Sequence, residues 1–145
     1  MNNDEIIYKI ELLEAKLGYI NACIASYYSL TLSKITNDIH QKLHFLMKTI
    51  LENKDYIDIR DSIELKKEVE KLQELLPNKE IYMSGHKIAC LLFEFSILIK
   101  SLITVINVND DIKEYLQYVQ EYTFLAGRYI NMSLLCNENY IIENK

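Results

Sequence analysis

The sequence predicts an all-α fold, a helical bundle with a buried central helix. Its 145 residues include one proline and three glycines against 50% hydrophobic residues, which leaves little material for hairpin turns or flexible linkers. The segment Ser84–Val108 is apolar on every side, so a helix there must be surrounded by other helices or lie in lipid. Glu94 and Lys100 would each cost about 2.5–3.5 kcal/mol at the centre of a bilayer, which favours the bundle.

Length and charge restrict the remaining possibilities. A chain of 145 residues fits one domain, residues 1–145. The net charge is −5 and the basic residues are dispersed, whereas binding to phosphate backbones needs clustered Lys and Arg, so we expect no nucleic-acid partner. The three cysteines lack C-x-x-C spacing, so we expect them to be reduced thiols. Neither terminus carries a hydrophobic run typical of a secretion signal or a membrane tail.

The first half of the chain predicts two amphipathic helices. Asn3 or Asp4 can cap the first helix, whose apolar residues recur four and three apart from Ile6 to Tyr27. A break is expected over Leu30–Ser33. The second helix, capped by Ser33 or Thr36, carries an apolar stripe that is wider than packing on one neighbour requires: Ile35, Ile39, Leu43, Leu46 and Ile50, flanked by Phe45, Met47 and Leu51.

The second half predicts three more helices. After an irregular turn over residues 53–60, Asp61 with Glu64 resembles a capping box, and the helix that follows ends before Pro77. Ser84 is the expected cap of the central helix, which stops near Asn107–Asp110. The last long helix spans Asp111–Leu135, followed by a short docking tail at residues 140–142.

No catalytic constellation emerges from the sequence. His40 and His44 are four apart and could reach one metal ion, but the adjacent Glu of a zinc protease and any Glu-x-x-His are missing. His86 and Glu94 have no partner placed beside them by the sequence. We therefore expect that the protein is not an enzyme and binds no metal or cofactor. A metal-dependent helical enzyme remains a third hypothesis.

The segment SGHKIACLLFEF, preceded by VEKLQELLPN, resembles the first homology region of the Bcl-2 family. In that family an amphipathic helix ending in E-L-F leads to N-W-G-R and then to an apolar central helix. Here Glu74, Leu75 and Leu76 stand in the E-L-F place, Lys87 stands in the Arg place, and residues 88–95 open the central helix. The chain is similar to a divergent viral Bcl-2 homologue, most plausibly poxviral, although it lacks Trp.

The resemblance implies an inhibitor of apoptosis whose hydrophobic surface groove captures the death-motif helix of host pro-apoptotic Bcl-2 proteins. Such a groove needs neighbouring helices that carry more apolar side chains than the packing of the core requires. Lys87 would pair with the Asp of the incoming helix, in a charged hydrogen bond worth about 1.5–3 kcal/mol. The candidate groove residues are Leu43, Leu46, Met47, Ile50, Val69, Leu72, Leu75, Lys87, Cys90 and Leu91.

An alternative within the same resemblance is a viral modulator of innate immune signalling that binds adaptor proteins through an outer face. Either function implies the cytoplasm of a host cell, with the mitochondrial outer membrane as a further location. Membrane contact would require a C-terminal tail beyond this sequence. A homodimer is also compatible with the sequence.

Overall fold

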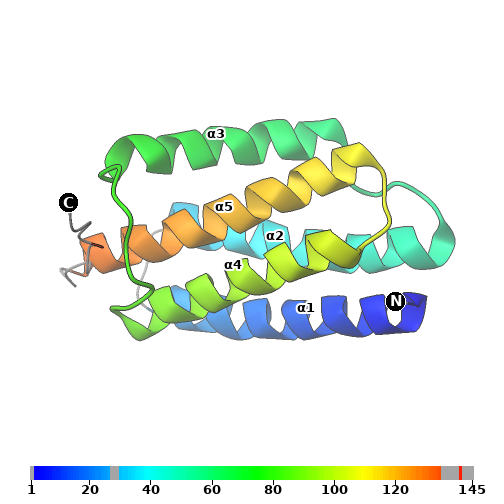
Figure 1. The fold of residues 1–145 in the computed structure, drawn as a ribbon, viewed down its shortest axis with the longest axis horizontal. Coiled ribbons are helices and arrows are strands. Elements are labelled where there is room, and N and C mark those ends of the chain that lie inside the picture. Colours follow the sequence, from blue (N-terminus) through cyan, green and yellow to red (C-terminus); the bar gives the residue numbers. More distant parts are fainter. Residues whose placement is uncertain (1, 27–29, 135–140, 142–145) are drawn as a thin grey trace.

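The structure, a computed structural model, describes residues 2–26, 30–134 and 141. Within these residues the chain forms five α-helices: α1 (Asn3–Ala25), α2 (Leu30–Glu52), α3 (Ile59–Leu75), α4 (Lys87–Val105) and α5 (Asp110–Ser133). The helices lie side by side in a bundle (Figure 1). The all-α class predicted from the sequence is therefore confirmed.

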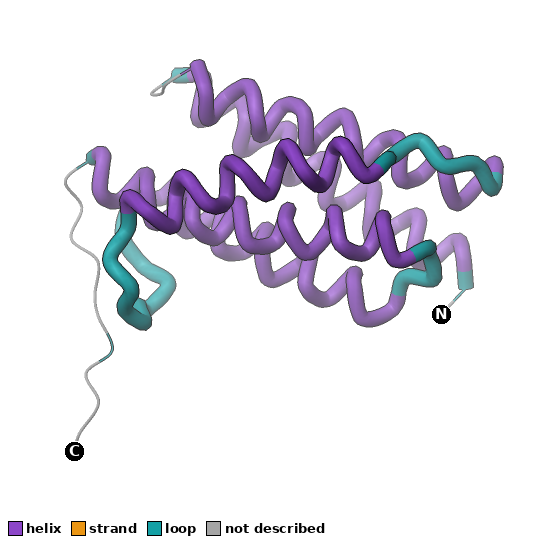
Figure 2. Tube along the Cα trace, turned by 90° about the horizontal axis from the view of Figure 1, so that it is seen from above, coloured by secondary structure: helices purple, strands orange, loops and turns teal. Residues whose placement is uncertain are grey.

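The order of the helices in space differs from their order in the chain. α5 lies between α3 and α4, and α1 packs on α2 and α4 (Figure 1). The view from above shows the connecting loops at the two ends of the bundle (Figure 2). One end therefore holds the start of α1, the end of α2 and the turn between α4 and α5.

The core is built from the apolar stripes that the helical period predicts. In α1 the buried positions recur every three or four residues, and Ile10, Leu17 and Ile24 have no exposed surface. α4 contributes the largest enclosed side chains, Phe93 and Phe95. α5 supplies the opposite wall, with Leu116 and Val119 fully buried in its first half.

The starts of several helices differ from the predicted ones. α1 is capped by Asn2, whose Oδ1 accepts from the backbone N–H of Glu5 at 2.9 Å, and not by Asn3 or Asp4. α2 already begins at Leu30, inside the expected break. The cap of α3 is Asp58, whose carboxylate accepts from the backbone N–H of Arg60 at 2.8 Å, while Asp61 takes the third helical position of the capping box. α4 is capped by His86, whose Nδ1 accepts from the N–H of Ile88 at 3.1 Å. A ring nitrogen therefore serves where a hydroxyl was expected.

The loop between α3 and α4 is tied to the last turns of α5. Asn131 is 1% exposed, and its Oδ1 accepts from the backbone N–H of His86 while its Nδ2 donates to the carbonyl of Ser84, both at 2.8 Å. The guanidinium of Arg128 donates to the carbonyl of Pro77 at 2.9 Å. Gly85, between the two bonds of Asn131, has φ +110°, a conformation that L side chains rarely adopt.

α4 has one buried and one exposed side. It packs on α1 and α5, so its outer positions, including Cys90, Glu94 and Ile97, face solvent. Among the described residues, α4 is the one helix long and apolar enough to cross a membrane, a test that core helices also pass. Only 44% of that apolar segment is buried inside the bundle.

Candidate functional site

A polar pocket of about 540 Å³ lies at the end of the bundle where α1 begins and α2 and α4 end. Its apolar walls come from isoleucines of α1, α2 and α5 and from an isoleucine and a valine of the turn between α4 and α5, and its polar walls come mainly from asparagines. We call it the bundle-end pocket. Its described lining residues are Asn3, Ile6, Thr49, Ile50, Asn53, Asp55, Ile106, Asn107, Val108, Asn109 and Ile112.

Hydrogen bonds fix several of these polar groups. Asn109 caps α5, since its Oδ1 accepts from the N–H of Ile112 at 2.9 Å, and its Nδ2 donates to Asp55 Oδ1 at 3.1 Å. Thr49 donates to the carbonyl of Phe45 at 3.0 Å. The amide of Asn107 has no hydrogen bond to another described residue and is exposed at the pocket. An amide both donates and accepts hydrogen bonds, so the pocket suits a ligand with mixed polarity.

The electrostatics of the bundle-end pocket have two opposing contributions. The N-termini of α1 and α5 both lie at this pocket, and helix N-termini attract anions through their free N–H groups and their dipoles. Asp55 lines the same pocket, and its carboxylate opposes an anion. The described lining residues include no Lys or Arg, so the field is only weakly favourable to phosphate.

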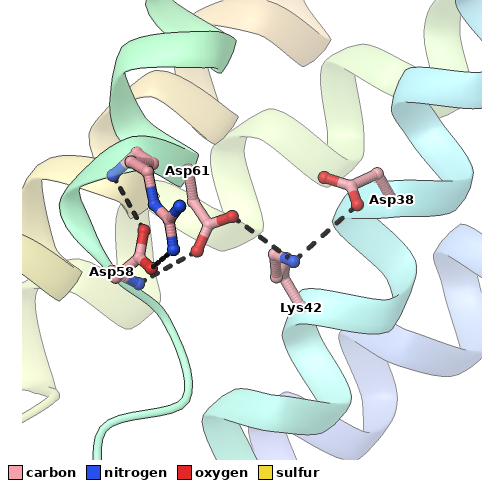
Figure 3. A network of polar contacts seen from close by, with 5 residues as sticks. Asp38, Lys42, Asp58 and Asp61 are labelled. Carbon is pink, nitrogen blue, oxygen red and sulfur yellow. Dashed lines mark hydrogen bonds and ion pairs between the residues drawn. The ribbon is translucent and has the colours of Figure 1, made fainter.

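A second, more open cleft of about 720 Å³ separates the first half of α2 from the start of α3. Lys42 of α2 lies between two carboxylates, with its Nζ 3.8 Å from Asp38 Oδ1 and 3.4 Å from Asp61 Oδ1 (Figure 3). Asp61 Oδ2 also accepts from the backbone N–H of Asp58 at 2.9 Å. The same carboxylate thus caps α3 and joins α3 to α2.

Two buried hydroxyls lie near this charged cleft without a hydrogen-bond partner among the described residues, those of Ser62 and Tyr115. Burial raises the pKa of the Tyr115 phenol well above its usual value, and the negative charges of Asp38 and Asp61 raise it further. The phenol therefore stays neutral in the folded protein. An unpaired buried hydroxyl costs about 1–3 kcal/mol.

Tyr115→Phe is expected to leave the fold unchanged and to raise the free energy of unfolding by about 1 kcal/mol, because it removes an unpaired polar atom. The effect should depend on pH. The folded pKa lies above the value of about 10 in the unfolded chain, so the contribution of the neutral phenol is complete below pH 10 and is lost as pH rises above it.

Urea unfolding at neutral pH and at alkaline pH measures both effects. We expect wild type to lose more stability than Tyr115→Phe on going to alkaline pH. Equal losses would contradict the raised pKa of the Tyr115 phenol. A Phe variant less stable than wild type at neutral pH would show that the hydroxyl has a hydrogen-bond partner.

The structure does not bring the predicted groove residues together in one cavity. Leu43, Leu46, Val69 and Leu72 are buried in the core. Leu75, Lys87 and Cys90 are exposed, Met47 is half-buried, Ile50 lines the bundle-end pocket and Leu91 lines a hollow between α1 and α4. The cleft between α2 and α3 is lined by none of the ten, since its described apolar walls are Ile35 and Leu65.

The histidines lie apart from both cavities. His44 Nδ1 is 3.6 Å from Glu14 Oε1, and His40 lies against Gly18 of α1. Within the part of the chain that the structure describes, no three His, Cys, Asp or Glu side chains are grouped so that they could hold a metal ion. The structure therefore adds nothing in favour of the metal-dependent enzyme.

No protein-family model matches this chain, and no curated protein matches it by sequence. Comparison of the fold gives a different result. An arginine-to-lysine variant of the PduO-type ATP:co(I)rrinoid adenosyltransferase from Lactobacillus reuteri, complexed with ATP, superposes with a TM-score of 0.84. The match has 17% identity and covers 97% of this chain and 87% of the other.

Two further variants of the Lactobacillus reuteri enzyme, each complexed with cobalamin and ATP, also superpose. The phenylalanine-to-histidine variant gives a TM-score of 0.80 at 16% identity, covering 97% of this chain and 83% of the other. The phenylalanine-to-alanine variant gives 0.80 at 16% identity, covering 95% and 84%. The chain has the fold of these adenosyltransferases.

These adenosyltransferase-like matches correct the functional predictions made from the sequence. The viral Bcl-2 homologue, the apoptosis inhibitor, the alternative modulator of innate signalling and the pro-apoptotic partners are all contradicted. The expectation that the protein is not an enzyme is contradicted as well, since the structures that share its adenosyltransferase-like fold are enzymes. The resemblance rested on Ser84–Phe95, a loop followed by an apolar helix start, and packing on two neighbours imposes that pattern in more than one kind of bundle.

The residues that sequence reasoning missed are the asparagines of the bundle-end pocket. The cluster at residues 107–110 was visible in the sequence, and it predicted only the end of a helix. Asn3 and Asn53, also in the pocket, are distant from it in the chain. Their convergence depends on how α1, α2 and α4 are aligned, which no local pattern indicates.

Proposed function

We propose that this chain is an ATP:corrinoid adenosyltransferase, which transfers the adenosyl group of ATP to a corrinoid. The observation that carries the proposal is the match of nearly the whole chain, 95–97%, to adenosyltransferase structures with TM-scores of 0.80–0.84. Two of those structures hold cobalamin and ATP together. In the transfer, the electron pair of a Co(I) corrinoid forms a bond to the ribose carbon that carries the triphosphate. The bond from that carbon to the triphosphate oxygen breaks, and the triphosphate leaves with its electron pair while the cobalt becomes Co(III).

The bundle-end pocket is the proposed position of the adenosine. Its volume of about 540 Å³ falls within the range of about 300–1,000 Å³ that is usual for small-molecule sites. The amides of Asn3, Asn53 and Asn107 offer donors and acceptors for a purine edge and for ribose hydroxyls. A corrinoid is much larger than a nucleoside and would have to lie outside this pocket.

The triphosphate would lie near the N-termini of α1 and α5. Free N–H groups at a helix start bind phosphate oxygens, and the helix dipole favours negative charge there. The carboxylates of Asp110 and Asp111 in the first turn of α5 already offset part of the positive potential at that helix start. We therefore expect the nucleoside to contribute most of the affinity and the phosphates to contribute less.

A second candidate function is binding without transfer, by a protein that keeps this fold. One observation favours it: the described residues of the bundle-end pocket include no cation to hold a triphosphate. The two candidates differ in what they recognise. A transferase must bind the triphosphate of ATP as well as the nucleoside. A protein that only binds nucleosides need not distinguish ATP from adenosine.

Asn107→Ala is expected to weaken ATP binding about tenfold, because the loss of one or two hydrogen bonds to the ligand costs about 1–2 kcal/mol. The side chain is exposed and follows the last turn of α4, so the fold should be unaffected. Isothermal titration calorimetry with ATP, and separately with adenosine, measures the change.

Asn78→Ala is the matched control, since Asn78 is also exposed and follows α3 at the opposite end of the bundle. It should bind ATP as wild type does. If wild type gives no heat of binding with ATP, the proposed nucleotide site is wrong. Equal losses in both variants would place the ligand elsewhere.

A further inference from the structure

The cleft of about 720 Å³ between α2 and α3 shares no described lining residue with the bundle-end pocket. It exists because α2 packs mainly on α1 and α3 packs mainly on α5, so the two helices stand apart. We call it the α2–α3 cleft. Its described walls carry four carboxylates and two ammonium groups, those of Asp38, Asp61, Glu64, Glu68, Lys34 and Lys67. The lining therefore has an excess of negative charge.

The negative charge lies deeper in the α2–α3 cleft than the positive charge. The side chains of Asp61 and Glu68 are 19% and 25% exposed, whereas Lys34 and Lys67 are exposed. Exposed lysine side chains are long and flexible, so their ammonium groups can turn into solvent. Burial raises the pKa of the Tyr122 phenol on α5, and the charge of Glu68 raises it further. The potential at the base of the cleft thus favours a cation.

Two buried hydroxyls near the base of the cleft have no hydrogen-bond partner among the described residues, those of Tyr115 and Ser62. Tyr115 is 2% exposed and Ser62 is 3% exposed. The charges of Asp38 on one wall and Asp61 on the other both act on the Tyr115 phenol, so this hydroxyl lies between the walls. Its oxygen can accept from an N–H group of a bound cation, which would remove the cost of leaving it unpaired.

Lys42 does not occupy all the acceptor positions of the carboxylates beside it. Figure 3 shows its ammonium group between Asp38 and Asp61, at 3.8 and 3.4 Å from the nearer oxygens. Both distances exceed the length of about 2.7–2.9 Å that is usual for a charge-assisted hydrogen bond. The carboxylate oxygens therefore keep room for the donors of a ligand.

Three of the carboxylates follow one another along α3. Asp61, Glu64 and Glu68 are three and four residues apart, so they share one side of the helix, at intervals of about 4.5 and 6 Å along its axis. Chains of three or four methylene groups separate two amines by similar distances. Ile35 and Leu65 line the same cleft and offer apolar contacts to such a chain. The arrangement matches a linear molecule in which amines alternate with short aliphatic segments.

We propose that the α2–α3 cleft binds a linear aliphatic polyamine, whose ammonium groups donate hydrogen bonds to Asp38, Glu64, Glu68 and the hydroxyl of Tyr115. Within the described part of the chain, no three His, Cys, Asp or Glu side chains are grouped to hold a metal ion, so an extended organic cation fits better than a metal. The inference does not depend on the proposed adenosyltransferase activity.

The test is isothermal titration calorimetry with spermidine, on wild type, Glu68→Gln, Tyr115→Phe and Glu70→Gln. Glu70→Gln is the matched control, because Glu70 also belongs to α3 and is exposed but does not line the cleft. Magnesium chloride in the buffer screens attraction that depends on net charge alone. Circular dichroism checks that each variant is helical. If Glu68→Gln does not fold, Glu64→Gln replaces it, since Glu64 is exposed.

We expect Glu70→Gln to bind spermidine within about twofold of wild type, Glu68→Gln about tenfold more weakly and Tyr115→Phe about threefold more weakly. If wild type gives no heat with millimolar spermidine, the cleft holds water alone and the proposal is wrong. Equal weakening by Glu68→Gln and Glu70→Gln would identify spermidine as a nonspecific counterion and overturn the proposal. Unchanged binding by Tyr115→Phe would also overturn it, because the cation would then lie away from the buried phenol.

Discussion

Gly85→Ala is expected to lower the free energy of unfolding by about 3 kcal/mol. Two costs add at this position. The backbone has φ +110°, where a residue with a Cβ is strained by about 1–3 kcal/mol. The new methyl would also lie 2.6 Å from Asn131 Cγ, so the amide that holds Ser84 and His86 would have to move from its buried place.

The contact between Gly85 and Asn131 also predicts how the stability effects of substitutions at the two positions combine. Asn131→Ala removes two hydrogen bonds of 2.8 Å and should cost about 2–3 kcal/mol alone. In the double variant the methyl no longer meets the amide, so the combined loss should be smaller than the sum of the two.

Urea unfolding of the four proteins measures that coupling. Gly18→Ala is the control, because the new Cβ would be 3.3 Å from the His40 ring and alanine is the better helix former. We expect it to change stability little. A Gly85→Ala variant as stable as the control would contradict the described loop geometry.

Gly127→Ala is expected to lower the free energy of unfolding by about 1 kcal/mol net, although alanine favours helices. Its Cβ would lie 2.6 Å from Phe93 Cε1 and 3.1 Å from the carbonyl oxygen of Ala89. Phe93 is 1% exposed and its ring stands 5.4 Å from that of Phe124, centroid to centroid, so it has little room to move. Overpacking of this kind costs about 1–3 kcal/mol, more than the gain of about 1 kcal/mol in helix propensity.

A smaller side chain at position 93 should relieve the clash. Phe93→Leu destabilises the wild type by leaving a cavity, but in the Gly127→Ala background it makes room for the methyl. We expect the double variant to be more stable than the sum of the single losses implies. Strict additivity in thermal or urea unfolding would mean that α4 and α5 do not approach each other at Gly127.

The sequence predicted the helices well because their signals are local. Stripes such as Ile10, Leu13 and Leu17, or Leu65, Val69 and Leu72, recur with the helical period and are buried as expected. Pro77 does follow the end of α3. The caps were less predictable, because the acceptor can be any nearby polar group, as Asp58 and His86 illustrate.

The topology and the site could not be derived from the same signals. α4 supplies the large core side chains Phe93 and Phe95, yet α5 is the helix that lies between α3 and α4. Both helices carry apolar residues over much of their surface. Which of the two takes the central position depends on packing over the whole bundle. The bundle-end pocket combines Asn3, Asn53 and Asn107 from three segments, which only the fold brings together.

The most direct measurement is turnover. Purified protein is mixed with ATP and with cobalamin reduced chemically to the Co(I) state, and adenosylcobalamin is followed by its absorbance and by chromatography. We expect product in proportion to the protein, with a lower rate at subsaturating ATP for Asn107→Ala than for Asn78→Ala. Binding of both ligands without product, or no product at any protein concentration, would contradict the assignment as an adenosyltransferase.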